Sequence, residues 1–364
     1  MPNLAMTRRH WLTGGAAVLS AGLAGNADAK APPGYPRSYE MLQAQADREG
    51  QLVVYSSADV TDVAGLLRTF QARQPRINVR YQHLASTELY DRYLREVNAG
   101  AQSADFLFSS AMDTQIKLVN DGYAQSYASP EKPFLPPWAV WKDQAYGLTA
   151  EPIVFAYNRR LLPAADVPHS HDDLEQILSR RSAQLRGKVG TYDVERSGTG
   201  FLFFSQDAQI SHDTWKLLKA LGRTSPRFDV WAHDILARVS SGEQVLAYNV
   251  MSSYALERHA TDPWVEVVFP SDYTLVMSRI AFISKDARHP AAAKVFLDFL
   301  LSRQGQSLLA QRYMTPVRTD LEPATPHANP MNSRAIHVGP ELIANLDRLK
   351  YAKLIGEWKR AVGR

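Results

Sequence analysis

The chain has 364 residues, a formal net charge of +4 and no cysteine. Without cysteine there is no disulfide framework, no thiolate metal site and no lipidated N-terminal cysteine. Basic and acidic residues are interspersed, as at Arg92, Arg95 and Glu96, which argues against nucleic acid as a partner. The length allows two domains of ordinary size.

Residues 1–29 have the pattern of an export signal. Arg8 and Arg9 form a basic start, residues 14–23 form a short apolar stretch, and Ala27, Asp28 and Ala29 match a signal-peptidase site. The stretch TRRHWL resembles a twin-arginine signal, with an amphipathic helix carrying a chance arginine pair as the alternative. We expect cleavage near Ala29 and a soluble mature protein in the periplasm.

The next part of the chain alternates short β-rich runs with amphipathic helices. Residues 52–55 form an apolar run typical of a parallel strand buried on both faces. A helical pattern follows through residues 63–70, and further strands are expected at 77–81 and 105–108 with a helix between them. This β-α-β-α-β order predicts a doubly wound parallel sheet.

A stretch rich in proline and tryptophan, residues 130–141, interrupts the alternation, which then resumes without any internal repeat. Strands are expected near 152–158, 189–191, 245–248 and 279–283, with helices over 291–301 and 341–362.

Small polar residues follow several of these strands, where open α/β sheets bind small ligands. Hydroxyls, glycines and free backbone N–H groups at such positions can hold an anion. Each serine could instead only cap a helix. The expected ligand contacts are Ser56, Ser57, Asp59, Thr87, Glu88, Ser109, Ser110, Arg196, Ser197, Gly198, Thr199, Asn249, Ser252, Ser253 and Tyr254.

Enzyme motifs are missing from the sequence. There is no Gly-x-Ser-x-Gly elbow, no His-Glu-x-x-His, no Walker loop and no cysteine nucleophile. We therefore expect a binding protein with no catalytic residues and no cofactor.

Five stretches together carry a family resemblance: GQLVVYSSADVTDVAGLLRTFQ, SADFLFSS, YGLTAEPIVFAYNRRLL, RSGTGFLFF and HPAAAKVFLDFLLSRQGQSLLAQRYMTPV. They resemble the periplasmic solute-binding proteins of bacterial ABC importers, over residues 50–318. The subclass is similar to the ferric-binding, phosphoglycerate-binding and aminoethylphosphonate-binding proteins.

The resemblance implies a type II periplasmic-binding fold, in which two doubly wound α/β lobes are joined by crossover strands around a ligand cleft. Residues 30–152 and 262–318 are expected to form lobe 1, residues 153–261 lobe 2, and residues 319–364 a C-terminal helical segment. The first crossover falls on residues 151–157 and the return on residues 258–269. The implied partners of this monomer are a small ligand and an inner-membrane permease.

The sequence departs from the ferric pattern. The tandem tyrosines of ferric members fall on Ser252 and Ser253, and Asp59 replaces a histidine ligand, whereas Glu88 matches a carboxylate that some members use. Fe(III) favours anionic oxygen donors, which serine does not supply. A small organic anion, such as an organophosphate or phosphonate, is therefore favoured. The alternatives are a ferric site formed by Asp59, Glu88 and Tyr254, and a periplasmic sensor feeding a two-component system.

Overall fold

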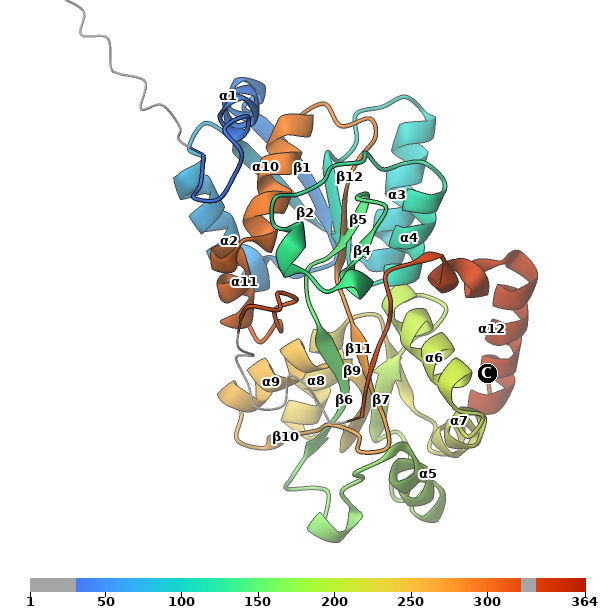
Figure 1. The fold of residues 1–364 in the computed structure, drawn as a ribbon. Coiled ribbons are helices and arrows are strands. Elements are labelled where there is room, and N and C mark those ends of the chain that lie inside the picture. Colours follow the sequence, from blue (N-terminus) through green and yellow to red (C-terminus); the bar gives the residue numbers. More distant parts are fainter. Residues whose placement is uncertain (1–30, 322–331) are drawn as a thin grey trace, which may run out of the picture.

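The computed structural model describes residues 31–321 and 332–364, which form two α/β lobes (Figure 1). Each lobe is built on one β-sheet with helices packed against it. The predicted fold class is confirmed. The predicted signal, with Arg8, Arg9 and Ala29, lies outside the described residues. Within the described ranges, no helix is both long enough and apolar enough to cross a membrane.

Lobe 1 contains a six-stranded sheet in the order β2-β1-β3-β12-β5-β4. The strand β1 pairs in parallel with β2 and β3, and β12 runs antiparallel to β3. Its strands are β1 (Gln51–Ser56), β2 (Asn78–His83), β3 (Phe106–Ser109), β4 (Val140–Trp141), β5 (Ala145–Gly147) and β12 (Ile280–Ile283). Its helices are α1 (Tyr39–Glu49), α2 (Val60–Arg73), α3 (Ser86–Asn98), α4 (Met112–Asn120), η1 (Lys132–Phe134), η2 (Pro137–Ala139), α10 (Pro290–Leu301) and α11 (Arg303–Ala310).

Lobe 2 contains a seven-stranded sheet in the order β13-β11-β6-β9-β7-β8, with β10 also paired to β6. Its strands are β6 (Glu151–Asn158), β7 (Val189–Tyr192), β8 (Arg227–Asp229), β9 (Leu246–Met251), β10 (Val265–Val268), β11 (Thr274–Met277) and β13 (Ser333–Ala335). The helices here are η3 (Ala164–Asp166), α5 (His171–Arg180), α6 (Gly198–Ile210), α7 (Thr214–Arg223), α8 (Ala232–Ser241), α9 (Ser252–Thr261) and α12 (Arg348–Val362), whereas η4 (Pro340–Leu346) packs against α4 of lobe 1.

The chain passes between the lobes at two neighbouring places. It leaves lobe 1 between β5 and β6, and it returns between β11 and β12. The return therefore lies near residues 278–279, and not at the expected residues 258–269. Because β10 and β11 both pair with β6, residues 265–277 lie with lobe 2, although the sequence analysis placed them in lobe 1. The alternation of strands and helices could not locate the boundary between the lobes, because the strands of both lobes have similar sequence patterns.

The C-terminal segment contacts both lobes. It was expected to be helical, but it also contains the strand β13. The strand β13 pairs with β11 of lobe 2, and the backbone N–H of Val338 then donates to the carbonyl of Trp138 in lobe 1, 2.9 Å away. Figure 1 shows η4 beside α4 and α12 running back along lobe 2. The indole of Trp358 is buried in lobe 2 against Phe228. This segment therefore links the lobes a third time.

Replacing Trp358 with alanine tests this attachment. Truncation of a large buried aromatic side chain costs about 3–5 kcal/mol of unfolding free energy, and Trp358 is only 1 % exposed. We expect a loss of that size in urea unfolding followed by circular dichroism. Leu349→Ala in the same helix is the control, because Leu349 is 80 % exposed. Equal losses for both variants would contradict the attachment.

Candidate ligand-binding site

A cavity with about 400 Å³ of empty space lies between the two lobes. Its walls come from the carboxyl ends of parallel strands in both sheets. Lobe 1 supplies Ser57 after β1, His83 at the end of β2 and Ser110 after β3. Lobe 2 supplies Tyr192, Trp231 and Met251 at the corresponding ends of β7, β8 and β9. We call this space the interlobe cavity.

Six of the predicted ligand contacts line the interlobe cavity: Ser57, Asp59, Ser110, Ser197, Thr199 and Tyr254. Three of them form a chain of hydroxyl groups across the lobes. The hydroxyls of Ser57 and Ser110 are 3.2 Å apart, and those of Ser110 and Thr199 are 2.7 Å apart. The structure therefore brings together residues that are far apart in sequence.

The other predicted contacts lie elsewhere or are engaged by the protein itself. The hydroxyls of Ser56 and Ser109 accept the backbone N–H groups of Ala58 and Ala111 in the turns before α2 and α4, so they bond within the protein without capping either helix. The side chains of Glu88 and Arg196 are exposed and do not line the cavity. The remaining predicted residues that do not line it are Thr87, Gly198, Asn249, Ser252 and Ser253.

Two of these residues have clear roles inside lobe 2. Asn249 has a left-handed φ of 57°, and its amide donates to the buried carboxylate of Asp207. The Ser253 hydroxyl donates to Glu151. Both side chains therefore bond to other residues of the protein, and neither lines the interlobe cavity as predicted.

The lobes are in contact across the cleft, so the structure is a closed form. Besides the bond between Ser110 and Thr199, the hydroxyl of Thr87 donates to the carbonyl of Arg196 over 3.2 Å. A Cβ atom at Gly198 would lie 3.2 Å from atoms of lobe 1, which is tighter than ordinary contact. The N-terminal turn of α6 thus contacts lobe 1 and also lines the cavity through Ser197 and Thr199.

A buried ion pair lies next to the cavity, where the two crossovers meet. The Nε and Nη2 atoms of Arg279 donate to the two carboxylate oxygens of Glu151 at 2.8 and 3.2 Å. These side chains are only 1 % and 0 % exposed. Burial alone would lower the pKa of Arg279, but the carboxylate of Glu151 raises it well above its ordinary value, so the guanidinium stays charged.

Four buried side chains around the cavity have a polar atom with no hydrogen-bond partner among the described residues. These atoms are Nη1 of Arg279, Nε2 of His83, the hydroxyl of Tyr192 and the hydroxyl of Ser252. His83 and Tyr192 line the cavity, whereas Arg279 contacts its wall residues Met251 and Tyr254. Buried polar groups are nearly always paired, so unmet hydrogen-bonding capacity is concentrated here.

The side chains in this region are uncharged except at Arg279 and the carboxylates. Burial lowers the pKa of His83, which favours the neutral imidazole. Burial also raises the pKa of Tyr254 to about 12, although the charge of Arg279 opposes this rise. Both phenols, Tyr192 and Tyr254, are therefore hydrogen-bond donors at neutral pH.

Sequence reasoning missed His83, Tyr192, Trp231 and Arg279. The first three lie at or just after the carboxyl ends of strands, so the rule that selected the serines applies to them too. Arg279 gave no such signal, because the sequence placed the return crossover elsewhere.

Metal-binding side chains are not grouped around the cavity. Among the described residues, no three histidine, aspartate or glutamate side chains are placed to hold a metal ion. Of the three residues of the ferric alternative, Asp59 and Tyr254 line the cavity, but Glu88 does not. The structure therefore does not assemble that predicted set.

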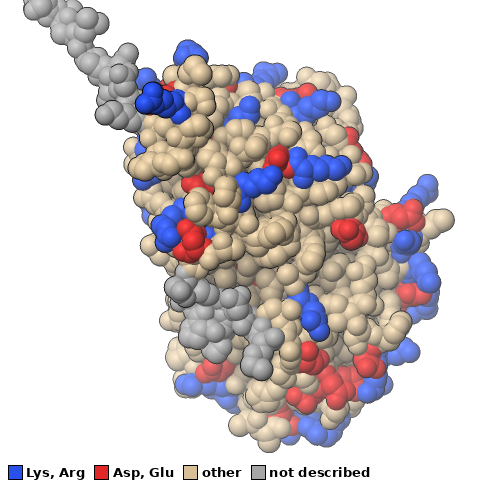
Figure 2. All heavy atoms as spheres, in the orientation of Figure 1, with Lys and Arg blue, Asp and Glu red and all other residues tan. Residues whose placement is uncertain are grey.

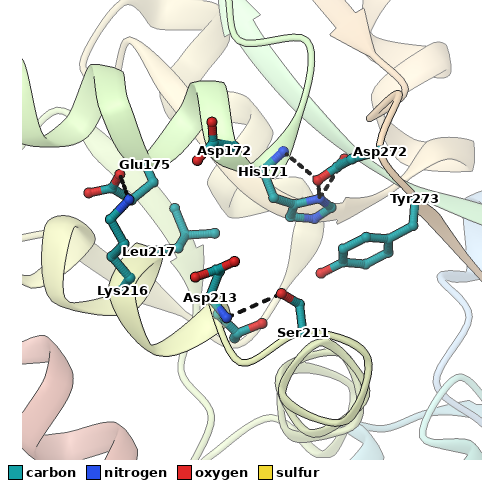
Figure 3. A pocket seen from close by; sticks show the side chains of 10 residues that line it. His171, Asp172, Glu175, Ser211, Asp213, Lys216, Leu217, Asp272 and Tyr273 are labelled. Atoms are coloured by element: carbon teal, nitrogen blue, oxygen red, sulfur yellow. Dashed lines mark hydrogen bonds and ion pairs between the residues drawn. The ribbon is translucent and has the colours of Figure 1, made fainter.

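A separate surface hollow lies on lobe 2, away from the cleft (Figure 3). His171 pairs with Asp272 and stacks on Tyr273 at a ring-centroid distance of 4.2 Å. On its other side Lys216 pairs with Glu175. None of the predicted contacts lines this hollow, and its wall comes from one lobe only. It is therefore not the predicted site.

Charged residues are scattered over both lobes on the face drawn in Figure 2. Lysine and arginine alternate with acidic residues there, without a continuous basic field. This distribution agrees with the view that the protein has no nucleic-acid surface on this face.

Two α/β lobes with a small polar cavity between them define a hinged ligand-binding protein. The family model for bacterial extracellular solute-binding proteins matches residues 65–332, and the chain belongs to this family.

Solved structures agree with this assignment. A substrate-binding protein of an ABC transporter from Agrobacterium tumefaciens is 38 % identical, with a TM-score of 0.82 over 86 % of this chain and 94 % of that one. AfuA of Actinobacillus pleuropneumoniae, with fructose-6-phosphate bound, is 20 % identical, with a TM-score of 0.70 over 86 % and 99 %. Iron-bound HitA of Pseudomonas aeruginosa is 17 % identical, with a TM-score of 0.69 over 85 % and 99 %. The last two likenesses show the fold alone.

The buried ion pair can be tested by a double-mutant cycle. Glu151→Gln leaves the Arg279 guanidinium buried without its counter-ion, and we expect a loss of about 3–5 kcal/mol of unfolding free energy. Replacing both residues with methionine removes both charges, so the double variant should be more stable than either single methionine variant. Urea unfolding of the unaltered protein, the two single methionine variants and the double methionine variant completes the cycle, and Glu151→Gln is measured beside them. Additive losses would show that the two side chains are not coupled.

Proposed function

We propose that the protein captures a small organic anion in the interlobe cavity by closing its two lobes. The supporting observation is the set of unpartnered polar atoms at the cavity: those of His83 and Tyr192 in its lining, and Nη1 of Arg279 beside it. An anion would accept hydrogen bonds from several of them at once. Hydrogen bonds to a charged partner are the stronger ones.

The charge balance of the cavity wall favours an organic anion over Fe(III). A trivalent cation would lie near the charged Arg279, and it would need the phenolate form of Tyr254, whose pKa burial raises to about 12. An anion gains from the same guanidinium and needs only the neutral phenols. Phosphate esters, phosphonates and carboxylates all have suitable acceptor oxygens.

The proposed role is that of the binding component of an ABC importer in the periplasm. The Agrobacterium tumefaciens protein that is 38 % identical is described as the substrate-binding protein of an ABC transporter. Closure would then present the loaded form to a membrane permease. In this role the protein binds its ligand and catalyses no reaction.

A thermal-shift screen with phosphate esters, phosphonates, carboxylates and ferric salts tests the ligand class. We expect stabilisation by organic anions, because a ligand that binds only the folded state raises the melting temperature. Ferric salts should produce no visible phenolate colour. A coloured ferric complex, with no anion causing a shift, would contradict the proposal.

Tyr192→Phe tests the site itself. It removes one unpartnered hydroxyl and should weaken the best anion of the screen by about 1.5–3 kcal/mol, roughly 10- to 100-fold, in calorimetry. The matched control is Tyr248→Phe, because the Tyr248 hydroxyl donates to Asp207 inside lobe 2. That control should lower stability and leave affinity unchanged. Unchanged affinity in Tyr192→Phe would exclude this hydroxyl as a contact.

The export route is tested by replacing Arg8 and Arg9 with lysine in the full-length precursor. If the twin-arginine pattern is recognised, the variant should remain inside the cell while the unaltered protein reaches the periplasm. Cell fractionation followed by immunoblotting measures this. Normal export of the variant would indicate the general secretory route instead.

A further inference from the structure

A second cavity adjoins the interlobe cavity and shares Asp59, His233 and Tyr254 with it. It has about 660 Å³ of empty space, part of it open to solvent. The start of α2 in lobe 1 forms one side, and α8 and α9 of lobe 2 form the other. Three carboxylates line it: Asp59, Asp62 and Glu257. We call these three residues the acidic subsite.

Asp62 is the unusual member of the acidic subsite. It is 94 % buried, since only 6 % of its side chain is exposed. Its Oδ1 atom accepts from Nη2 of Arg312 at 3.3 Å, whereas Oδ2 has no hydrogen-bond partner in the described parts of the chain. A buried carboxylate oxygen without a donor is costly. A donor from outside the protein would remove that cost.

The protein's own cations do not fill this position. Arg312 also pairs with Glu257, so its guanidinium bridges the two lobes, and it does not line the cavity. Its Nε atom is buried without a partner in the described residues, but it lies outside the cavity lining. Arg258 also lines the cavity, but in the described part of the chain the ion-pair partner of Asp62 is Arg312. Among the residues that line this cavity, Asp62 is therefore the one with a buried carboxylate oxygen that no described residue satisfies.

The acidic subsite lies close to the proposed anion site. Tyr254 lines both cavities, and Arg279 contacts its ring with the guanidinium carbon 5.5 Å from the ring centroid. Burial raises the pKa of Asp62, and the charge of Arg279 is near enough to oppose that rise. Positive and negative groups are thus arranged within reach of one small molecule.

We infer that the solute carries a protonated amine as well as its anionic group, and that Asp62 accepts this amine. The inference rests on the proposed function and adds the class of solute: a small zwitterion. Its anionic end interacts with the donors around Arg279, and its ammonium group enters the acidic subsite. Asp59 and Glu257 supply the remaining negative charge around the ammonium group.

Calorimetry with two matched ligand pairs tests this inference: phosphoethanolamine against ethyl phosphate, and β-alanine against propionate. In the unaltered protein we expect the amine-bearing member of at least one pair to bind tighter by about tenfold or more, as one charge-assisted hydrogen bond provides. Asp62→Asn should remove most of that difference and leave the affinity for the amine-free member nearly unchanged. Asn keeps an oxygen for Arg312, so the fold should be retained.

The control is Asp213→Asn, which removes an exposed carboxylate from the other acidic hollow, shown in Figure 3. This variant should retain the full difference within each pair. Equal affinities within both pairs in the unaltered protein would overturn the amine subsite while leaving the anion site intact. If neither pair binds, the amine subsite is also rejected. The proposed anion site is then tested separately by the thermal-shift screen. The comparison within each ligand pair uses the unaltered protein, so it can contradict the inference even if Asp62→Asn does not fold.

Discussion

The buried pair of Arg279 and Glu151 fixes the geometry on which the cleft depends. It lies where the chain passes between the lobes, so it joins both crossovers at one point. Thr149 completes the arrangement, because its hydroxyl donates to Glu151 and accepts the backbone N–H of Arg279. The carboxylate is fully engaged, whereas the guanidinium keeps one free nitrogen. A buried pair rarely adds much stability, so its position beside the cavity points to a role in binding.

The closed form is held by a small number of polar contacts between the lobes. Hydroxyl bonds join Ser110 to Thr199, and Arg312 bridges Asp62 and Glu257. A single hydrogen bond of this kind contributes only about 1 kcal/mol net. The C-terminal segment adds a further link through Val338. A ligand that contacts both lobes can therefore shift the balance between open and closed forms with a modest differential affinity.

Strand periodicity predicted doubly wound α/β structure, and strand ends predicted the edge of the sheets that lines the interlobe cavity, because both are local features. The two-lobed arrangement was implied only by the family resemblance. It could not separate Ser57 from Ser56, or Ser110 from Ser109. Neighbouring residues at a strand end point to opposite sides, and only the fold decides which one faces the cavity. Asn249 was misplaced because a left-handed backbone turns it towards Asp207. Arg279 was missed because its role depends on a crossover whose location no local pattern reveals.

The distribution of unmet polar groups between the lobes explains how binding and closure can be one event. Lobe 1 contributes His83 and Asp62, whereas lobe 2 contributes Tyr192 and Ser252. In an open form water can reach all of these atoms, so none of them is costly. Closure removes that water, and the atoms then need partners that the described residues do not supply. Under the proposed function, a solute with groups of both signs would provide those partners only when the lobes meet around it, so closure would become favourable when the solute is present.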